Sequence, residues 1–405
     1  MTIPGRPHAT GGLRAVREEA SEERLDKAIA VMDAFAARTG VTSDLAPTRY
    51  LWTDAFAVCN DVALREATGD DRFLARARRL VDQVHRVLGR HREDDPRAGW
   101  ISGLSESDGG AHPTAGGLRI GKADNERSAS EGYRPEAEWN RDGQYYHYLT
   151  KWMFALLRMA AATGDATYHR WAVELARAAH DGFVVRAPGR VTMHWKMSID
   201  LSRPLVPTEG HHDALDGLVT FSGLAAEAPG GPNPEILRKE TEELRAMCQG
   251  RSWATEDALG IGGLLTDTLR CAQLDRSGHP TGSSLFGTLL RAAATSLRSL
   301  GEPSFLRLPA LGRLAFRELG LALGLEAVER LETWDDLPVP ADTASLYAKV
   351  LDDVASYVPV GRAILDFWNE DRHRAADTWA DHRDISDVMW ATCLVPEGFL
   401  SGWRS

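Results

Sequence analysis

The chain has 405 residues, of which 43% are hydrophobic, and its formal net charge at pH 7 is −11. This acidic balance disfavours nucleic-acid binding, because phosphate recognition needs a basic face and the sequence presents none. No apolar stretch approaches the roughly 20 residues that span a bilayer, and residues 1–19 lack the apolar core of a secretory signal. We therefore expect a cytoplasmic protein that makes no membrane contact.

Residues 1–19 are expected to form a flexible N-terminal segment, followed by a single domain over residues 20–405. No linker rich in Pro, Ser or Gly separates self-contained halves of that domain. Residues 22–37 predict a helix without a hairpin partner, which is free to pack against the returning C-terminus. The four cysteines are widely scattered and form no Cys-x-x-Cys pair, which is typical of reduced thiols in a core.

A repeat organises the chain from there on. The tetrapeptide Ala-Thr-Gly-Asp occurs at residues 67–70 and again at residues 162–165, and at the same offset His85 corresponds to His180. Coincidence over that span is implausible, so the two copies predict the same local structure.

Each copy predicts a helical hairpin. Residues 50–64 carry apolar side chains on nearly every face, which is typical of a helix surrounded by protein. Residues 72–88 place their apolar side chains on one stripe and arginines opposite, which is typical of a helix with one side in solvent. Gly69 and Asp70 between them suit a helix C-terminus and the N-cap of the next helix. The hairpin therefore has one inner and one outer helix.

Five further hairpins continue this pattern less cleanly. They pair residues 142–163 with 165–183, 213–228 with 234–248, 256–274 with 283–300, 305–319 with 321–331, and 343–357 with later segments reaching Cys393. The glycines at positions 260–263 indicate either close helix packing or space for a ligand.

Repeated hairpins need neighbours to cover their apolar faces, which an open solenoid or a closed ring provides. Long excursions at residues 89–141 and 184–212 favour the ring, because they would all emerge over the mouth formed by the starts of the inner helices. The predicted fold is an all-α (α/α)6 toroid of inner and outer helices with long loops on one rim.

Two polar clusters lie at helix entrances above this mouth. In residues 136–152, Asp142, Gln144 and His147 are free to face the cup, although Asp142 also sits where an N-cap belongs. In residues 209–217, His212 lies one helical turn before Asp216, so their side chains are able to meet.

The second cluster also contains His211 and Asp213. A histidine beside carboxylates at a cavity mouth suits acid/base chemistry near neutral pH. The alternative is a capping Asp213 with solvated histidines.

A third set lies mainly in the loops. Flat aromatic faces with nearby polar groups suit sugar rings, although large aromatics also fill gaps between hairpins. The set comprises Trp52, Trp100, Trp139 and Trp195, with His194, Lys196, Arg119 and Lys122, and His382 from the last hairpin.

No histidine pair shows the spacing of metal ligands, and no Gly-rich phosphate loop is present, so we expect neither a metal nor a cofactor.

Six inner/outer hairpins with decorated loops and tryptophans at the rim resemble the (α/α)6-barrel, six-hairpin glycosidase-like superfamily. Its members include unsaturated glucuronyl hydrolases, inverting glucanases and, on a similar toroid, N-acylglucosamine 2-epimerases. The resemblance implies acid/base roles for Asp54, Asp142, His147, His212 and Asp213. It also implies that Trp52, Asp54, Trp100, Trp139, Gln144, His194, Trp195, Lys196, His211 and His382 contact a sugar or oligosaccharide.

The sequence thus predicts a carbohydrate-active enzyme, with a glycoside hydrolase as the main interpretation, either inverting or hydrating an unsaturated sugar. Asp142 and Asp213 are its expected acid/base pair. A sugar epimerase using His147 and His212 remains open, as does a non-catalytic sugar-binding barrel. A terpenoid-cyclase-like enzyme is a further alternative, because aromatic-lined cavities in αα-barrels stabilise carbocations and Asp335-Asp336 provides an acidic pair.

Overall fold

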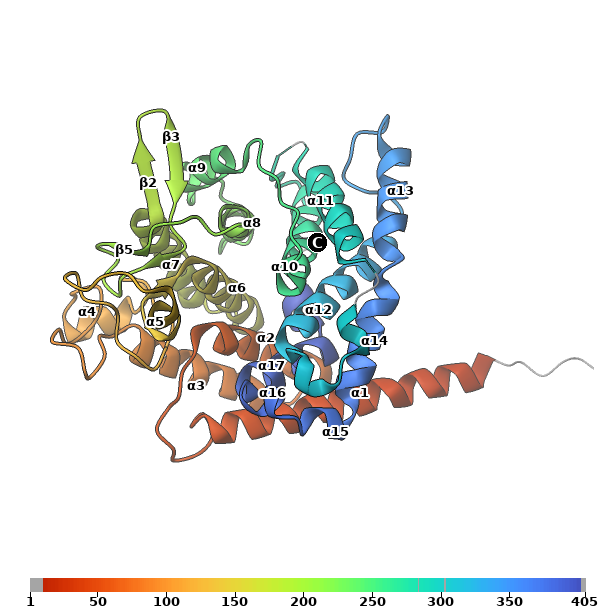
Figure 1. The fold of residues 1–405 in the computed structure, drawn as a ribbon, viewed down its shortest axis with the longest axis horizontal. Helices are drawn as coiled ribbons and strands as arrows, with labels where there is room; N and C mark the ends of the chain where they lie inside the picture. The colour runs from red at the N-terminus through yellow and green to blue at the C-terminus, as the bar shows by residue number, and fades with distance from the viewer. Residues whose placement is uncertain (1–9, 283, 302–303, 402–405) are drawn as a thin grey trace, which may run out of the picture.

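The inner helices close into a ring. The computed structural model describes residues 10–282, 284–301 and 304–401, and six of its helices line the centre (Figure 1). They pack in chain order and the last contacts the first. The ring comprises α2 (Leu51–Thr68), α6 (Tyr146–Thr163), α8 (Asp213–Ala226), α10 (Ala258–Arg276), α12 (Ala315–Glu332) and α17 (Arg383–Leu394). The predicted all-α toroid is confirmed.

Outer helices cover each inner helix. In chain order they are α3 (Asp71–Leu88), α7 (Ala166–Phe183), α9 (Arg238–Cys248), α11 (Leu285–Leu300), and α13 (Ala344–Ala355) with α14 (Val358–Asn369). The remaining outer position, against α17, is taken by α1 (Thr10–Arg38). Arg38 Nε donates to Asp384 Oδ1 at 2.8 Å, which ties α1 to α17. The expected contact between the first helix and the returning C-terminus is therefore present.

The repeated tetrapeptide builds the same turn twice. Gly69 ends α2 with φ 71°, and Gly164 ends α6 with φ 69°, a left-handed conformation that glycine adopts without a steric penalty. The carboxylates of Asp70 and Asp165 then accept hydrogen bonds from backbone N–H groups at the starts of α3 and α7. Residues 51–64 of α2 are all buried, as predicted for an inner helix.

The last two predicted hairpins are wrong in their pairing. A single helix, α12, covers residues 321–331 and only the last five of residues 305–319, and the short turns η1 (Ser304–Arg307) and η2 (Ala310–Gly312) precede it. Gly320 does not break the helix. The glycine that lets α10 approach is Gly262, because a Cβ on that residue would lie 2.0 Å from the Gly320 carbonyl oxygen.

The sixth hairpin differs from the prediction, because the N-terminal helix α1 is its outer helix. α13 and α14 pack on α12, so residues 343–357 belong to the outer layer of the fifth hairpin. The short helices α15 (Asp371–Arg374) and α16 (Asp377–Ala380) lead into α17, and α18 (Glu397–Leu400) packs against α2 and α10. The sequence indicated that the first helix was free to pack against the returning C-terminus, but it did not indicate that this helix replaces the outer helix of the sixth hairpin.

At the N-terminus, α1 begins at Thr10, so residues 10–19 of the expected flexible segment are helical. Residues 1–9 lie outside the described residues, as do Ser283, where the fourth outer helix was expected to begin, and the last four residues of the predicted domain. All four cysteines are buried and free. Within the described ranges, no helix has the length and apolar character needed to cross a membrane.

The two long loops carry the small amount of strand. One three-stranded antiparallel sheet joins β1 (Gln144–Tyr145), β4 (Lys196–Met197) and β5 (Pro204–Val206), with Tyr145 opposite Lys196. Strands β2 (Val184–Ala187) and β3 (Arg190–Met193) form the hairpin at the top of Figure 1. The short helices α4 (Glu106–Ala111) and α5 (Pro135–Asn140) lie in the first loop. The sheet holds both loops at the entrance of α6.

Candidate active site

A cleft opens over the starts of the inner helices, as the loop pattern predicted. It consists of two adjoining cavities that share the residues Trp52, His147, Asp257 and Leu259. The first, of about 440 Å³, is here called the carboxylate chamber because Asp213, Asp216 and Asp267 line it. The second, of about 750 Å³, is called the lysine chamber because Lys122 lines it, together with Tyr50, Trp139, Tyr148 and His382.

Asp213 is the first residue of α8, and its side chain is buried at the wall of the carboxylate chamber. Its Oδ1 atom lies 3.5 Å from His147 Nδ1. Its Oδ2 atom is buried and has no hydrogen-bond partner among the described residues. A buried carboxylate oxygen without a partner is costly, which makes it available to a ligand or a water molecule in the chamber.

Asp216 and Asp267 form a carboxyl pair deeper in the same chamber. Lys151 Nζ lies 2.5 Å from Asp216 Oδ1, and the two carboxyl groups share a hydrogen bond. Burial alone would raise the pKa of Asp216, but the Lys151 ammonium outweighs it and holds that pKa below its usual value. Burial, together with the adjacent Asp216 carboxylate, raises the pKa of Asp267 well above its usual range. Asp267 is therefore protonated at neutral pH, and Asp216 is charged.

Asp267 and Lys151 did not emerge from the sequence analysis. The available signal was a single carboxylate within the apolar run of residues 261–269, on a helix that the repeat assigns to the inner ring. A lone charge in such a run needs a buried partner. The partner was unpredictable, because Lys151 comes from α6, two helices away along the ring.

The two adjacent histidines line the carboxylate chamber. His212 Nε2 donates to the Trp253 carbonyl at 2.8 Å, and His211 Nε2 donates to the Ala254 carbonyl at 3.1 Å. Burial lowers the pKa of His212, so its imidazole is neutral near pH 7. The side-chain meeting of His212 with Asp216 does not occur, because Asp216 turns toward Lys151 instead.

Three of the predicted tryptophans line the cleft. Trp52 lies between the two chambers, Trp195 lines the carboxylate chamber, and Trp139 lines the lysine chamber with 63% of its surface exposed. Trp195 is held by a hydrogen bond from its Nε1 atom to Thr208 Oγ1 at 2.9 Å. His382 is exposed at the far side of the lysine chamber, on the approach to α17. These rings provide the flat surfaces that sugar rings favour.

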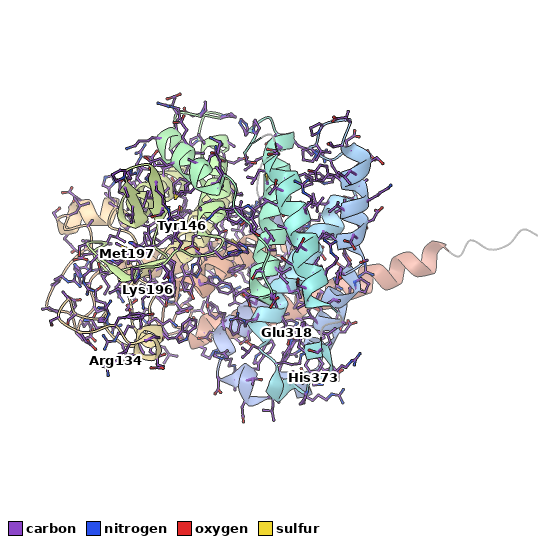
Figure 2. All side chains as sticks on the ribbon, turned by 45° about the horizontal axis from the view of Figure 1, so that its top comes forward. Arg134, Tyr146, Lys196, Met197, Glu318 and His373 are labelled. Carbon is purple, nitrogen blue, oxygen red and sulfur yellow. The ribbon has the colours of Figure 1, made fainter. Side chains whose placement is uncertain are left out.

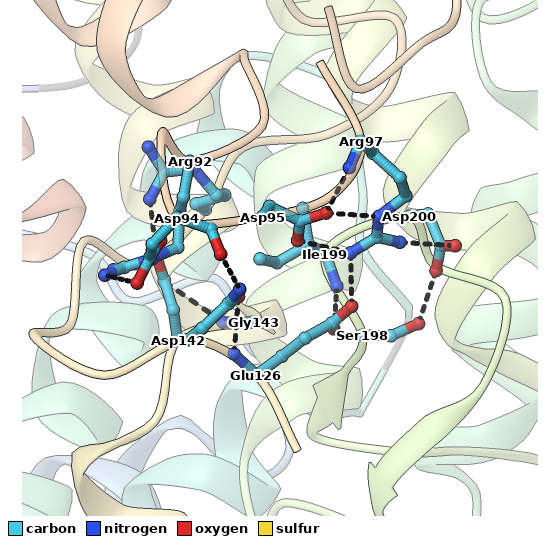
Figure 3. A network of polar contacts seen from close by, with 12 residues as sticks. Arg92, Asp94, Asp95, Arg97, Glu126, Asp142, Gly143, Ser198, Ile199 and Asp200 are labelled. Atoms are coloured by element: carbon cyan, nitrogen blue, oxygen red, sulfur yellow. Dashed lines mark hydrogen bonds and ion pairs between the residues drawn. The ribbon is translucent and has the colours of Figure 1, made fainter. Parts of the chain in front are cut away.

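Asp142 is not brought to the cleft. Its carboxylate is fully buried and forms an ion pair with Arg119, and its Oδ1 atom accepts from the backbone N–H groups of Gly121 and Gly143, each at 3.0 Å. Arg92 adds a contact at 3.5 Å, which Figure 3 shows beside the neighbouring loop network. Every position around this carboxylate is filled, so Asp142 anchors the first loop and has no open side for a substrate.

Gln144 and Lys196 also act within the loops. Gln144 accepts from the Leu118 N–H and donates to the carbonyls of Gly116 and Ile199. Lys196, labelled in Figure 2 beside Met197, is fully buried, and its Nζ atom lies 3.0 Å from Glu138 Oε1. Neither side chain lines either chamber.

The remaining expected contacts also lie outside both chambers. Asp54 caps α2 by accepting from the Tyr50 N–H, and burial raises its pKa to about 6 against the opposing charge of Arg49. Trp100 is buried, with the Arg90 guanidinium over its ring. His194 is half-buried in the second loop. The exposed pair Asp335-Asp336, which the cyclase alternative required, is likewise remote from the cleft lining.

No group of three or more His, Cys, Asp or Glu side chains able to hold a metal ion occurs in the part of the chain that the structure describes. The chemistry that the lining residues themselves support is proton transfer by carboxyl groups and imidazoles.

No family model matches the sequence, and no curated protein matches it either. Among solved structures, the GH76 α-1,6-mannanase of Salegentibacter sp. HEL1_6 matches with a TM-score of 0.53 at 11% identity, covering 93% of this chain and 99% of the mannanase. A GH76 α-mannanase from Bacteroides thetaiotaomicron matches with a TM-score of 0.51 at 8% identity, covering 94% and 97% of the two chains. The cellobiose 2-epimerase of Spirochaeta thermophila DSM 6192 is a weaker match, with a TM-score of 0.46 at 12% identity over 85% and 86% of the two chains. The likeness to the two mannanases shows that the chain has an (α/α)6 fold.

Proposed function

We propose that this protein is a carbohydrate-active enzyme that hydrolyses a glycosidic bond in the carboxylate chamber. The observation that carries the proposal is the presence of two carboxyl groups with different surroundings in one aromatic-lined cavity. Asp267 is held protonated, whereas Asp213 presents a buried oxygen without a hydrogen-bond partner among the described residues. Glycoside hydrolysis needs one carboxyl group that donates a proton and a second one that activates a water molecule.

The roles follow from these environments. Asp267 donates its proton to the leaving glycosidic oxygen as the bond from that oxygen to the anomeric carbon breaks. A water molecule attacks the anomeric carbon and passes its proton to Asp213. His147, 3.5 Å from Asp213, orients that carboxylate, and Lys151 keeps Asp216 charged so that Asp267 retains a hydrogen-bond acceptor. Trp52 and Trp195 line the same chamber and provide stacking surfaces for the sugar.

The structural neighbours support a sugar substrate. One of them is an α-1,6-mannanase variant, inactivated by replacing two consecutive aspartates, in complex with α-1,6-mannotetrose. In this chain, the consecutive aspartate pairs lie outside the cleft lining, and the chamber instead holds Asp213 and Asp216 one helical turn apart. Mannan specificity is therefore not part of the proposal.

A second candidate is a sugar epimerase. His147 and His212 both line the carboxylate chamber, and His212 is neutral and able to accept a proton. Two imidazoles on opposite faces of an opened sugar would remove and return a proton at one carbon. Solvent deuterium would then appear at a sugar carbon of the product, which does not happen when a saturated glycoside is hydrolysed.

The test is a turnover screen of saturated and unsaturated oligosaccharides and N-acyl sugars in deuterated buffer. It compares wild-type protein with the isosteric variants Asp213→Asn and Asp142→Asn. We expect release of reducing ends without carbon-bound deuterium, lost in Asp213→Asn and retained in the folded fraction of Asp142→Asn. Deuterium at a carbon of a saturated sugar would favour the epimerase, and full activity of Asp213→Asn would overturn the assignment of the base.

A further inference from the structure

Lys122 differs from the other cations that line the lysine chamber. It follows Gly121 in the first long loop, and its half-buried Nζ atom lies 5.5 Å from the ring centre of Tyr50 and 5.2 Å from that of Trp139. Among the described residues, its ammonium has no ion pair and no hydrogen bond, although it lies at the wall of a cavity. Burial lowers the pKa of Lys122, and the negative charge of Asp142 opposes that effect.

The arginines of the same chamber are each matched by a carboxylate. Arg38 lies 2.7 Å from Asp384 Oδ1, and Arg317 forms an ion pair with Asp257. Arg383 lies 3.7 Å from Asp387 Oδ2. These pairs neutralise the far wall, so the unpaired positive charge of the cavity is concentrated at Lys122. A partly desolvated cation gains most from a ligand that brings its own negative charge.

We propose that the lysine chamber binds an anionic substituent of the sugar substrate, with the Lys122 ammonium as its counter-ion. The proposal rests on the hydrolase function proposed above. Because the two chambers share Trp52 and His147, one oligosaccharide is able to occupy both. The acidic unit lies on Trp139 and against Lys122, and the neighbouring unit reaches Asp213 and Asp267.

The charge distribution narrows the substrate class further. The overall charge of −11 repels a polyanion, and the carboxylate chamber already holds the negative charges of Asp213 and Asp216. A short oligosaccharide with one acidic unit, held away from these aspartates, is therefore favoured over a uniformly charged polymer. The ammonium of a lysine is a compact point charge that donates hydrogen bonds to a carboxylate or to a phosphate ester.

Paired ligands test this inference through binding, independently of turnover. Each neutral hexose, as its methyl glycoside, is compared with the corresponding hexuronate and hexose 6-phosphate by isothermal titration calorimetry and ligand-observed NMR. We expect at least one acidic member to bind about 10-fold tighter than its neutral parent, because it adds a charge-assisted contact with the Lys122 ammonium. The hexuronate and phosphate arms distinguish the two sources of the anion.

Three variants locate the effect. Lys122→Met keeps the aliphatic stem against both rings and removes the charge, so the preference for the acidic ligand should fall to less than about 3-fold. Lys122→Arg should retain it. Lys239→Met removes an equal charge from the exposed face of α9 and should leave the preference unchanged.

Equal binding of acidic and neutral sugars by wild-type protein would overturn the inference alone. An acidic preference that survives in Lys122→Met would do the same, because it would place the counter-ion elsewhere. Binding of neither member of any pair would overturn the proposed function together with the inference.

Discussion

Two regions of this molecule bury carboxylates in opposite ways. In the loop region over residues 89–142 and 184–206, each buried carboxylate meets a cation: Asp142 meets Arg119, Glu138 meets Lys196, and Glu126 meets Arg97. Figure 3 shows the contact between Glu126 and Arg97. In the carboxylate chamber, Asp213 leaves one oxygen unpartnered within the described structure, and Asp267 has a carboxylate as its neighbour.

This difference separates structural carboxylates from reactive ones. A fully matched buried charge stabilises the conformation around it and has no capacity left for a substrate. An unmatched one is costly to the fold and available for chemistry. Residue type and position at a helix entrance are the same for Asp142 and Asp213, so the difference lies in the partners alone.

The largest effect is expected in the chamber. Asp213→Asn removes the proposed base without changing the shape of the side chain, so kcat/KM should fall by about 10²–10⁴-fold. Stability in urea should stay within about 1 kcal/mol of wild type, since no cation loses its partner. Steady-state kinetics and urea unfolding on the same preparation separate these effects, and an equal loss of stability and activity would contradict the distinction between the regions.

The opposite outcome, a loss of stability without a loss of activity, is expected for Asp142→Asn. Arg119 would remain buried without its carboxylate, which costs about 3–5 kcal/mol in comparable buried pairs. We expect a lower urea midpoint and normal kcat/KM per folded molecule. Retained stability accompanied by lost turnover would reverse the roles that we assign to the two aspartates.

The raised pKa of Asp267 predicts a pH dependence of stability. In the unfolded chain, Asp267 loses its proton at about pH 4. In the folded state, the raised pKa keeps that proton bound at higher pH values. The stabilisation is therefore complete below about pH 4 and is lost as pH rises toward the folded pKa, by up to about 1.4 kcal/mol per pH unit. Asp216, with its lowered pKa, acts oppositely and only at more acidic pH.

Urea unfolding of wild type and Asp267→Asn at several pH values from 5 to 9 measures this slope. The variant should lose the decline in stability with rising pH, and Asp94→Asn should keep it. Activity should also fall as pH rises through the folded pKa of Asp267, because the acid is then deprotonated. An identical slope in wild type and Asp267→Asn would show that another group carries the proton.

The smallest effect is expected at the loop surface. Asp94 pairs with Arg92 at 2.6 Å, but more than half of the Asp94 side chain is exposed (57%). Exposed pairs contribute about 0–1 kcal/mol, so Asp94→Asn should change the free energy of unfolding by less than about 1 kcal/mol. A loss as large as that of Asp142→Asn would mean that the whole loop network acts as one unit.

Much of the toroid was predictable from local patterns. The repeated Ala-Thr-Gly-Asp turn and the contrast between all-apolar and one-sided helices indicated the inner and outer layers. The prediction failed at Gly320, because a glycine inside a helix reads locally as a break. Its actual position, inside a helix and against Gly262 of α10, depends on a neighbour distant in sequence.

The residues of the candidate site also fall into a part that was predictable from local features and a part that was not. Helix entrances and rim aromatics are local features, so His147, His212, Asp213, Trp52, Trp139 and Trp195 were identified, and they line the cleft. The partners of a buried charge are not local features. Asp142 was expected to act in catalysis because Arg119, 23 positions before it, was not known to enclose it.

The sequence by itself determined the layers of the toroid and the end at which the cleft opens, because helix periodicity and capping act within a few residues. Only the tertiary structure decided that α1 takes the outer position against α17 and which partners each carboxylate meets. A pKa depends on burial and on charges brought within a few ångströms, and Asp216, Asp267 and Lys151 come from three separate inner helices.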